Sequence, residues 1–129
     1  MRLVLAKAIC EAEFGQPTVP EPQVEALKRS SRVELATALK GSDLPKGSRL
    51  LKVYATSPEG ARRVVHLLAV ADETLFLLFY RDKNDPVGAN ITIKNPDFRK
   101  QLRKHLQLLH DDLEAGAFEV WEDACLPEK

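Results

Sequence analysis

The stretch GARRVVHLLAVADETLFLLFYR, residues 60–81, holds two apolar runs that are joined at Asp72 and Glu73. Both runs are rich in β-branched and aromatic residues. Short runs of this composition, bounded by turn-forming residues, are typical of β-strands. The stretch therefore predicts a β-hairpin with a tight turn close to Asp72.

Alternation with a period of two assigns the side chains of this hairpin to two faces, if Ala71 lies opposite Thr74 across the turn. One face then carries Val64, Leu68, Val70, Leu75, Leu77 and Phe79. The other carries Val65, Leu67, Ala69, Phe76 and Leu78. Because both faces are apolar, and because a two-stranded ribbon alone is marginally stable in water, we expect the hairpin to be covered on both sides. It should form the centre of the fold.

The segment before the hairpin extends it to three strands. Residues 49–55 alternate weakly, with Leu51 and Val53 on one side and Lys52 and Tyr54 on a wetter side. The sequence Ser-Pro-Glu-Gly at residues 57–60 has proline and glycine at turn positions. These features predict a three-stranded antiparallel meander, to which residues 118–121 could add a short last strand.

Helices are predicted before this meander. Residues 2–14 have apolar side chains at helical spacing before Gly15, and a short strand at residues 3–5 is a competing interpretation. Residues 16–22 contain three prolines and predict an extended linker. A helical stretch then begins at Val24. The Ser-x-x-Glu pattern at Ser31 has the form of a capping box, which predicts a second helical segment over residues 32–40.

A long helix is predicted after the meander. Asn95 and Pro96 supply a capping side chain and a proline for the first helical position, and Gly116 is a stop signal. An apolar stripe runs along the helix. It consists of Phe98, Leu102, Leu106, Leu109 and Leu113. We expect His105 and His110 on the helix surface.

The expected fold is α+β, with a small antiparallel sheet of three to four strands packed with N-terminal helices and one long C-terminal helix. The 129 residues, 44% hydrophobic and 29% charged, fit a single domain over residues 1–129. The net charge is zero, yet residues 46–104 carry twelve basic and six acidic side chains. The tail at about residues 117–129 is acidic. A basic middle favours an anionic partner, and the tail could fold back on it.

Several functional classes lack their motifs in this chain. It has no glycine-rich phosphate loop, no GxSxG and no HExxH. Cys10 and Cys125 are far apart and have no histidine at ligand spacing, so free thiols are favoured over a disulfide or a metal site. No apolar run approaches the roughly 20 residues that span a bilayer. We therefore predict a cytoplasmic protein with no metal and no cofactor.

The open end of the hairpin collects the residues that could perform chemistry. Arg62 and Arg63 must point to opposite faces, and each is costly to bury alone, so at least one should reach a phosphate or an internal carboxylate. Under the pairing above, His66 shares a face with Arg62 and Arg81. A structural role for this histidine and a proton-transfer role are both open, and the structural one is favoured.

The order of strand, Gly-x-Arg strand, apolar strand, Lys-Asn loop and helix is carried by short motifs. These are Leu51-Lys52-Val53, Gly60-Ala61-Arg62-Arg63-Val64-Val65, residues 75–80, Lys83-Asn84 and Asn90-Ile91-Thr92. Together they span roughly residues 44–115 and resemble the RelE/HigB group of toxins from bacterial type II toxin-antitoxin systems. The resemblance implies a metal-independent endoribonuclease, an mRNA interferase, that inhibits translation.

In such an enzyme the 2′-hydroxyl of the RNA is the nucleophile, and protein side chains move protons and stabilise the charged phosphorane. The resemblance implies that Lys52, Arg62 and Lys83 contact phosphate. Arg81 adjoins the matching motif and joins them on geometric grounds, and His66 or Tyr80 could move a proton. Further candidate RNA-binding residues are Lys46, Arg49, Arg63, Arg99 and Arg103.

Three functions remain open from the sequence. The first is the endoribonuclease toxin. The second is a non-catalytic RNA- or protein-binding module on the same scaffold. The third is a structural protein whose basic helix docks a partner chain. The partners expected are a cognate antitoxin, mRNA with or without the ribosome, and a second copy of the chain, with no membrane contact.

Overall fold

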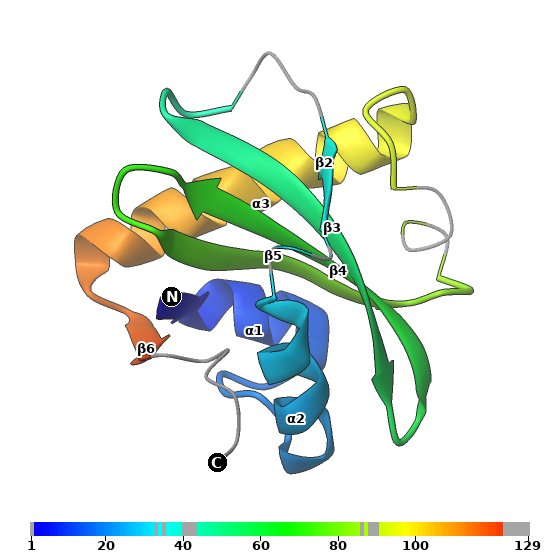
Figure 1. Cartoon of the computed structure of the whole chain (residues 1–129). Helices are drawn as coiled ribbons and strands as arrows, with labels where there is room; N and C mark the ends of the chain where they lie inside the picture. Colours follow the sequence, from blue (N-terminus) through cyan, green and yellow to red (C-terminus); the bar gives the residue numbers. More distant parts are fainter. Residues whose placement is uncertain are drawn as a thin grey trace.

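The computed structural model describes residues 2–32, 34, 36–39, 44–85, 87 and 91–122. It is an α+β fold with a six-stranded mixed sheet in the order β2-β3-β4-β5-β1-β6 (Figure 1). The elements are β1 (Arg2–Ala6), α1 (Lys7–Phe14), α2 (Glu21–Ser30), β2 (Thr37–Leu39), β3 (Ser48–Ser57), β4 (Gly60–Ala69), β5 (Thr74–Asp82), α3 (Pro96–Ala115) and β6 (Phe118–Trp121). The sheet is larger than the three to four strands expected. It is mixed because β1 runs parallel to β5 while the other neighbours are antiparallel.

The predicted hairpin, β4 and β5, lies in the middle of this sheet, and β3 completes the predicted meander. Both faces of the hairpin are covered, since Val64, Val65 and Leu77 are fully buried. The central, doubly covered hairpin is therefore confirmed. The turn differs from the prediction because Ala69, rather than Ala71, lies opposite Thr74.

A β-bulge changes the faces of the second strand. Val65 lies opposite Phe79 and His66 lies opposite Leu77, so Leu78 is an extra residue on β5. An extra residue reverses the alternation of every side chain beyond it. Phe79 and Arg81 consequently lie on the opposite face from the predicted one. His66 shares a face with Arg62 but not with Arg81.

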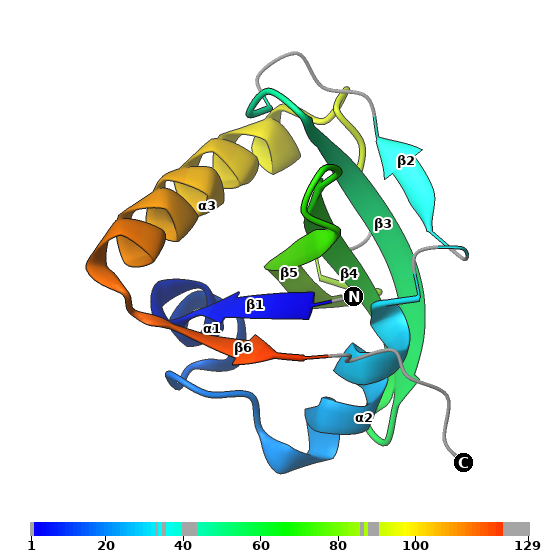
Figure 2. The same ribbon diagram turned by 60° about the vertical axis from the view of Figure 1, so that its left-hand side comes forward.

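Helices cover the two faces of the sheet (Figure 2). On one face, Phe98 of α3 packs against Phe79 with the ring centroids 5.3 Å apart. On the other face, the C-terminal end of α2 reaches His66 through Ser30. The two faces are called below the α3 face and the α2 face.

The long helix begins and ends where the sequence predicts. The Asn95 side chain accepts a hydrogen bond from the Asp97 amide, Pro96 follows in the first turn, and Gly116 adopts the left-handed conformation with φ 71° at the end. Its apolar stripe faces the sheet, with Phe98, Leu102 and Leu109 buried. The surface position predicted for His105 is wrong, since this side chain is buried.

The N-terminal region combines both interpretations of its first residues, because the strand β1 leads directly into the helix α1. The linker prediction ends early, since α2 begins at Glu21 and accommodates Pro22 in its first turn. The helix predicted over residues 32–40 is wrong in its described part, where Thr37–Leu39 form β2. The Ser31 hydroxyl donates instead to the Lys28 carbonyl at the end of α2.

The short strand predicted at Phe118–Trp121 is confirmed as β6, an edge strand that pairs with β1. Residues 123–129 of the predicted acidic tail lie outside the described residues. On the other side of β1, its register partners in β5 are only residues 74–76. Beyond residue 76, the edge of β5 has α1 beside it instead of β1. One of the two sites described next lies at this edge.

Candidate functional site

The candidate residues separate onto two faces of the sheet. The register places Tyr54 opposite Arg63, and Arg63 opposite Arg81, so these three side chains form a cross-strand row on the α3 face. Lys52 lies two residues from Tyr54 and shares this face. Arg62 lies opposite Asp82 on the α2 face. The structure therefore brings Arg63, rather than Arg62, together with Lys52 and Arg81.

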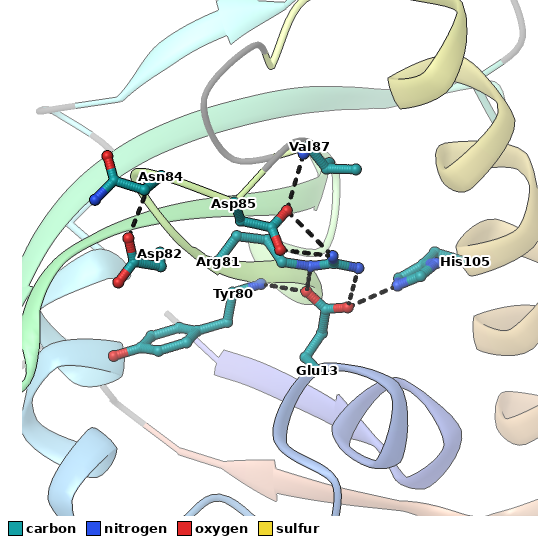
Figure 3. Close-up of polar contacts among 8 residues, drawn as sticks. All are labelled: Glu13, Tyr80, Arg81, Asp82, Asn84, Asp85, Val87 and His105. Atoms are coloured by element: carbon teal, nitrogen blue, oxygen red, sulfur yellow. Dashed lines mark hydrogen bonds and ion pairs between the residues drawn. The ribbon is translucent and has the colours of Figure 1, made fainter.

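At one end of this row, Arg81 belongs to a cluster around a buried carboxylate (Figure 3). The Glu13 side chain has an exposed fraction of 0% and receives two bonds from the Arg81 guanidinium, Nε to Oε1 at 2.7 Å and Nη2 to Oε2 at 2.9 Å. His105 Nε2 lies 2.9 Å from Oε2. The Tyr80 amide donates to Oε1 at 2.8 Å, which satisfies a backbone group on the free edge of β5. One carboxylate thus ties α1, β5 and α3 together, and we call this group the Glu13 cluster.

The charge of Glu13 is fixed by these donors. Burial alone raises the pKa of a carboxyl group, but the hydrogen bonds from His105, Arg81 and the Tyr80 amide outweigh it and hold the pKa of Glu13 below its usual 4.5. A carboxylate with a lowered pKa is a poor general base at neutral pH. We therefore infer that Glu13 is a structural anion, which holds its donors in place, and not a general base.

The other arginine of the hairpin end is also held by carboxylates. Arg62 Nη1 lies 3.1 Å from Asp82 and Nη2 lies 3.5 Å from Glu59. Arg81 has a second partner in Asp85 at 3.4 Å. A polar pocket of about 430 Å³ runs between these groups. Its charged lining consists of Arg62, Arg81, Glu13, Glu59, Asp82 and Asp85. With two cations against four carboxylates, this lining disfavours a phosphate.

The two candidate proton carriers are engaged inside the protein. The Ser30 hydroxyl donates to the Leu27 carbonyl at 2.6 Å, so His66 Nε2, 3.0 Å away, is the donor to Ser30 Oγ. Burial lowers the pKa of His66 to about 4, so this histidine is neutral at pH 7. The Tyr80 hydroxyl donates to Gln23 Oε1 at 2.5 Å, and burial raises the pKa of Tyr80. Neither group is placed to exchange a proton with a solvent-side substrate.

The other end of the cross-strand row has a different character. Tyr54 is 60% exposed, the largest exposed fraction among the exposed large hydrophobic side chains that the structure describes. The Arg63 guanidinium carbon lies 4.0 Å from the centre of the Tyr54 ring, and Lys52 Nζ lies 5.7 Å from it. Lys52 Nζ also lies 3.5 Å from the Ile91 carbonyl. Within the described parts of the chain, neither cation has a carboxylate in ion-pair contact. We call Lys52, Tyr54 and Arg63 the Tyr54 face.

Sequence reasoning missed Tyr54 as a functional residue. The signal was present, because the weak alternation of residues 49–55 places Tyr54 with Lys52 on the wetter side of the strand. An aromatic ring on a solvent-facing side, next to cations, is the pattern that could have been read as a binding surface.

The remaining candidates are exposed and scattered. Arg99 and Arg103 are exposed on α3, and Lys83 is exposed in the turn after β5. Lys46 is exposed in the turn before β3. Arg49 is exposed and lies opposite Leu68, which puts it on the α2 face, away from Tyr54.

The part of the chain that the structure describes contains no group of three or more His, Cys, Asp or Glu side chains able to hold a metal ion. Among the described helices, none has the length and apolar character needed to cross a membrane. Comparisons with models of protein families, with curated proteins and with solved structures find no match to this chain. The relation to RelE/HigB toxins therefore stays a resemblance carried by short motifs, and the two ends of the cross-strand row are the candidate sites.

Proposed function

We propose that the protein is a binding module for single-stranded RNA and that the Tyr54 face is its contact surface. The observation that carries the proposal is an exposed aromatic ring with an arginine 4.0 Å from its centre and a lysine close by. Proteins that bind single strands combine these elements, since bases stack on aromatic rings while cations contact the backbone phosphates.

The charge around the Tyr54 face supports an anionic ligand. Arg63 and Lys52 contact the ring rather than a carboxylate of the described chain, so their charge is available to a phosphate. The first half of α3 lies on the same face of the sheet and adds four exposed cations. These are Arg99, Lys100, Arg103 and Lys104. A strand leaving the Tyr54 ring could follow this basic surface.

The exposed ring favours RNA over an acidic protein partner. Carboxylates of a protein could pair with the cations, but they would leave the exposed part of the ring, which Arg63 does not cover, without a stacking partner. A base supplies a π-face for the ring, and its phosphates supply charge for Arg63 and Lys52. An RNA duplex keeps its bases stacked inside the helix, so the proposal requires a preference for single strands. The choice of RNA over DNA comes from the resemblance to RelE/HigB toxins.

Binding without cleavage is favoured by the state of the catalytic candidates. Arg62 and Arg81 are held by carboxylates, His66 is buried and neutral, and the Tyr80 hydroxyl is bonded to Gln23. The charged groups that contact the Tyr54 ring among the described residues are the cations Arg63 and Lys52.

The test is fluorescence anisotropy with labelled oligoadenylate, as a single strand and annealed to oligouridylate. Tyr54→Ala should weaken binding of the single strand by about tenfold to a hundredfold, the equivalent of about 1–3 kcal/mol per stacked base. Arg49→Ala is the matched control, an exposed cation on the same strand that points to the other face. Equal binding of duplex and single strand, or full affinity in Tyr54→Ala, would contradict the proposal.

An endoribonuclease is the second candidate, and the cross-strand row favours it, since Arg81 shares a face with Arg63 and Lys52. A phosphate on this face would have to draw Arg81 away from Glu13. Incubation with translating ribosomes and excess chelator should then yield cleaved mRNA, and the fraction of Arg81→Ala that stays folded should not cleave it. If the mRNA stays intact and expression of the chain without a partner is harmless, the endoribonuclease is excluded and the binding module is the remaining proposal.

A further inference from the structure

An apolar groove lies on the α3 face at the opposite end of β3 and β4 from Tyr54. It has a volume of about 290 Å³ and lies between the second half of α3 and the start of β5. Its apolar walls are Leu67, Ala69, Phe76, Leu106, Leu109 and Leu113. Leu67 and Leu109 form a buried floor, whereas Phe76, Leu106 and Leu113 remain partly open to solvent. The volume is close to the lower end of small-molecule sites, at roughly 300 Å³.

The walls and the rim of the groove suit different parts of a ligand. Apolar surface exposed to water is unfavourable, so an aliphatic group that covers these walls is stabilised there. On the rim, the Ser48 hydroxyl donates to the Pro45 carbonyl, and the Gly47 carbonyl accepts from the Val70 amide. These polar groups are already bonded within the turn that precedes β3.

Among the described residues of the rim, one cation is left for a ligand. His110 Nε2 lies 3.3 Å from Glu114, so these two groups face each other. Lys46 is exposed on the turn, and it has no ion pair with any residue that the structure describes. A ligand that fills the walls with an aliphatic chain and places one negative charge at the rim would match both features.

We propose that this groove binds a medium-chain fatty acid, with its alkyl chain against the leucines of α3 and its carboxylate at Lys46. The chain must be short, because the groove holds only about 290 Å³. A polar ligand would leave the walls uncovered. This site is independent of the Tyr54 face and of RNA binding.

The experiment is calorimetric titration of the full chain with straight-chain carboxylates from butanoate to decanoate, below their micellar concentrations. Affinity should rise about fourfold for each added methylene and stop rising once the groove is full. Ala69→Leu, which fills the groove from its wall, should abolish binding while the thermal unfolding transition shows that the variant folds. An affinity that does not change with the length of the carboxylate, or full affinity in Ala69→Leu, overturns the proposal.

The carboxylate contact is tested without touching the core. Lys46→Glu should weaken octanoate binding by about tenfold and leave the binding of 1-octanol unchanged. Lys94→Glu, a change of an exposed lysine outside the groove, is the matched control. An equal loss in both variants would assign the effect to overall charge and would overturn the contact with Lys46. If the protein instead forms a dimer that Ala69→Leu abolishes, a second copy occupies the groove and the fatty-acid proposal fails.

Discussion

Arg63 and Arg81 are cross-strand partners on the same face of the sheet, and their surroundings differ completely. Arg63 rests on an exposed tyrosine, with no carboxylate partner among the described residues. Arg81 is 21% exposed and is enclosed by Glu13 and Asp85. The two residues are of the same type and lie opposite each other on neighbouring strands. The comparison therefore shows that the neighbours of an arginine decide whether its charge is available to a ligand. One arginine is suited to a ligand and the other holds the fold.

The largest expected effect comes from removing the charge at the centre of the Glu13 cluster. Glu13→Gln takes the buried carboxylate away from Arg81 and His105 and leaves Arg81 with Asp85 alone. Breaking a buried pair from one side costs about 3–5 kcal/mol. Urea denaturation at pH 7 should show a loss of this order in the free energy of unfolding. Glu11→Gln is the control, since it removes an exposed carboxylate from the same helix. Equal stability of the two variants would mean that the Glu13 cluster is not structural.

A second effect of similar size should appear as a pH dependence. The pKa of His66 is 6.5 in an unfolded chain and about 4 in the folded protein because the ring is fully buried. Between these pH values the unfolded state binds more protons, so stability is complete above pH 6.5 and falls as the pH decreases toward 4. The loss attributable to His66 is about 3 kcal/mol.

Urea denaturation of His66→Gln across the same pH range isolates this contribution. The amide can still donate to Ser30, but it does not titrate, so the decline between pH 6.5 and 4 should flatten. Glu13 contributes in a lower window, below pH 4.5, because its folded pKa is depressed. A variant that keeps the full decline above pH 4.5 would show that His66 is not the titrating group.

The hairpin, its flanking turn and the capped α3 helix could be predicted because their signals are local. Period-2 alternation, the Asn95-Pro96 start and Gly116 each act within a few residues. The bulge at Leu78 has no such signal, because a slip of one residue within a uniformly apolar run leaves the hydrophobic pattern intact. That slip moves Arg81 to the other face. Because the prediction did not contain it, the predicted site placed Arg81 on the same face as His66 and Arg62.

The parts that depend on distant partners could not be predicted. Glu13 looks like an ordinary charge on a short amphipathic helix, and only the three-dimensional fold shows that it meets Arg81 and His105, 68 and 92 residues away. The parallel pairing of β1 with β5 is equally non-local. Tyr54 differs, since its exposure follows from local alternation and could have been inferred from the same pattern that predicted β3.

Replacing each of the two arginines by alanine tests the comparison directly. Arg63→Ala should weaken RNA binding and reduce the slope of log affinity against log salt by about one phosphate contact, while stability at pH 7 changes little. Arg81→Ala should do the reverse, with a large loss of stability and an unchanged salt slope for the fraction that stays folded. Anisotropy titrations at several salt concentrations, paired with urea denaturation, measure both. Matching effects of the two variants on RNA binding would join the two regions into one site.

The smallest expected effect separates the ring of Tyr54 from its hydroxyl. Tyr54→Phe keeps the aromatic face on which Arg63 rests, so single-stranded RNA should bind within about twofold of the wild-type affinity if stacking is the dominant contact. Tyr54→Leu keeps apolar bulk without a π-system and should lose about tenfold or more in the same anisotropy titration. If Tyr54→Phe is as weak as Tyr54→Leu, the hydroxyl rather than the ring makes the contact. The Tyr54 face would then bind RNA by hydrogen bonding at its edge, and its preference for single strands would need another cause.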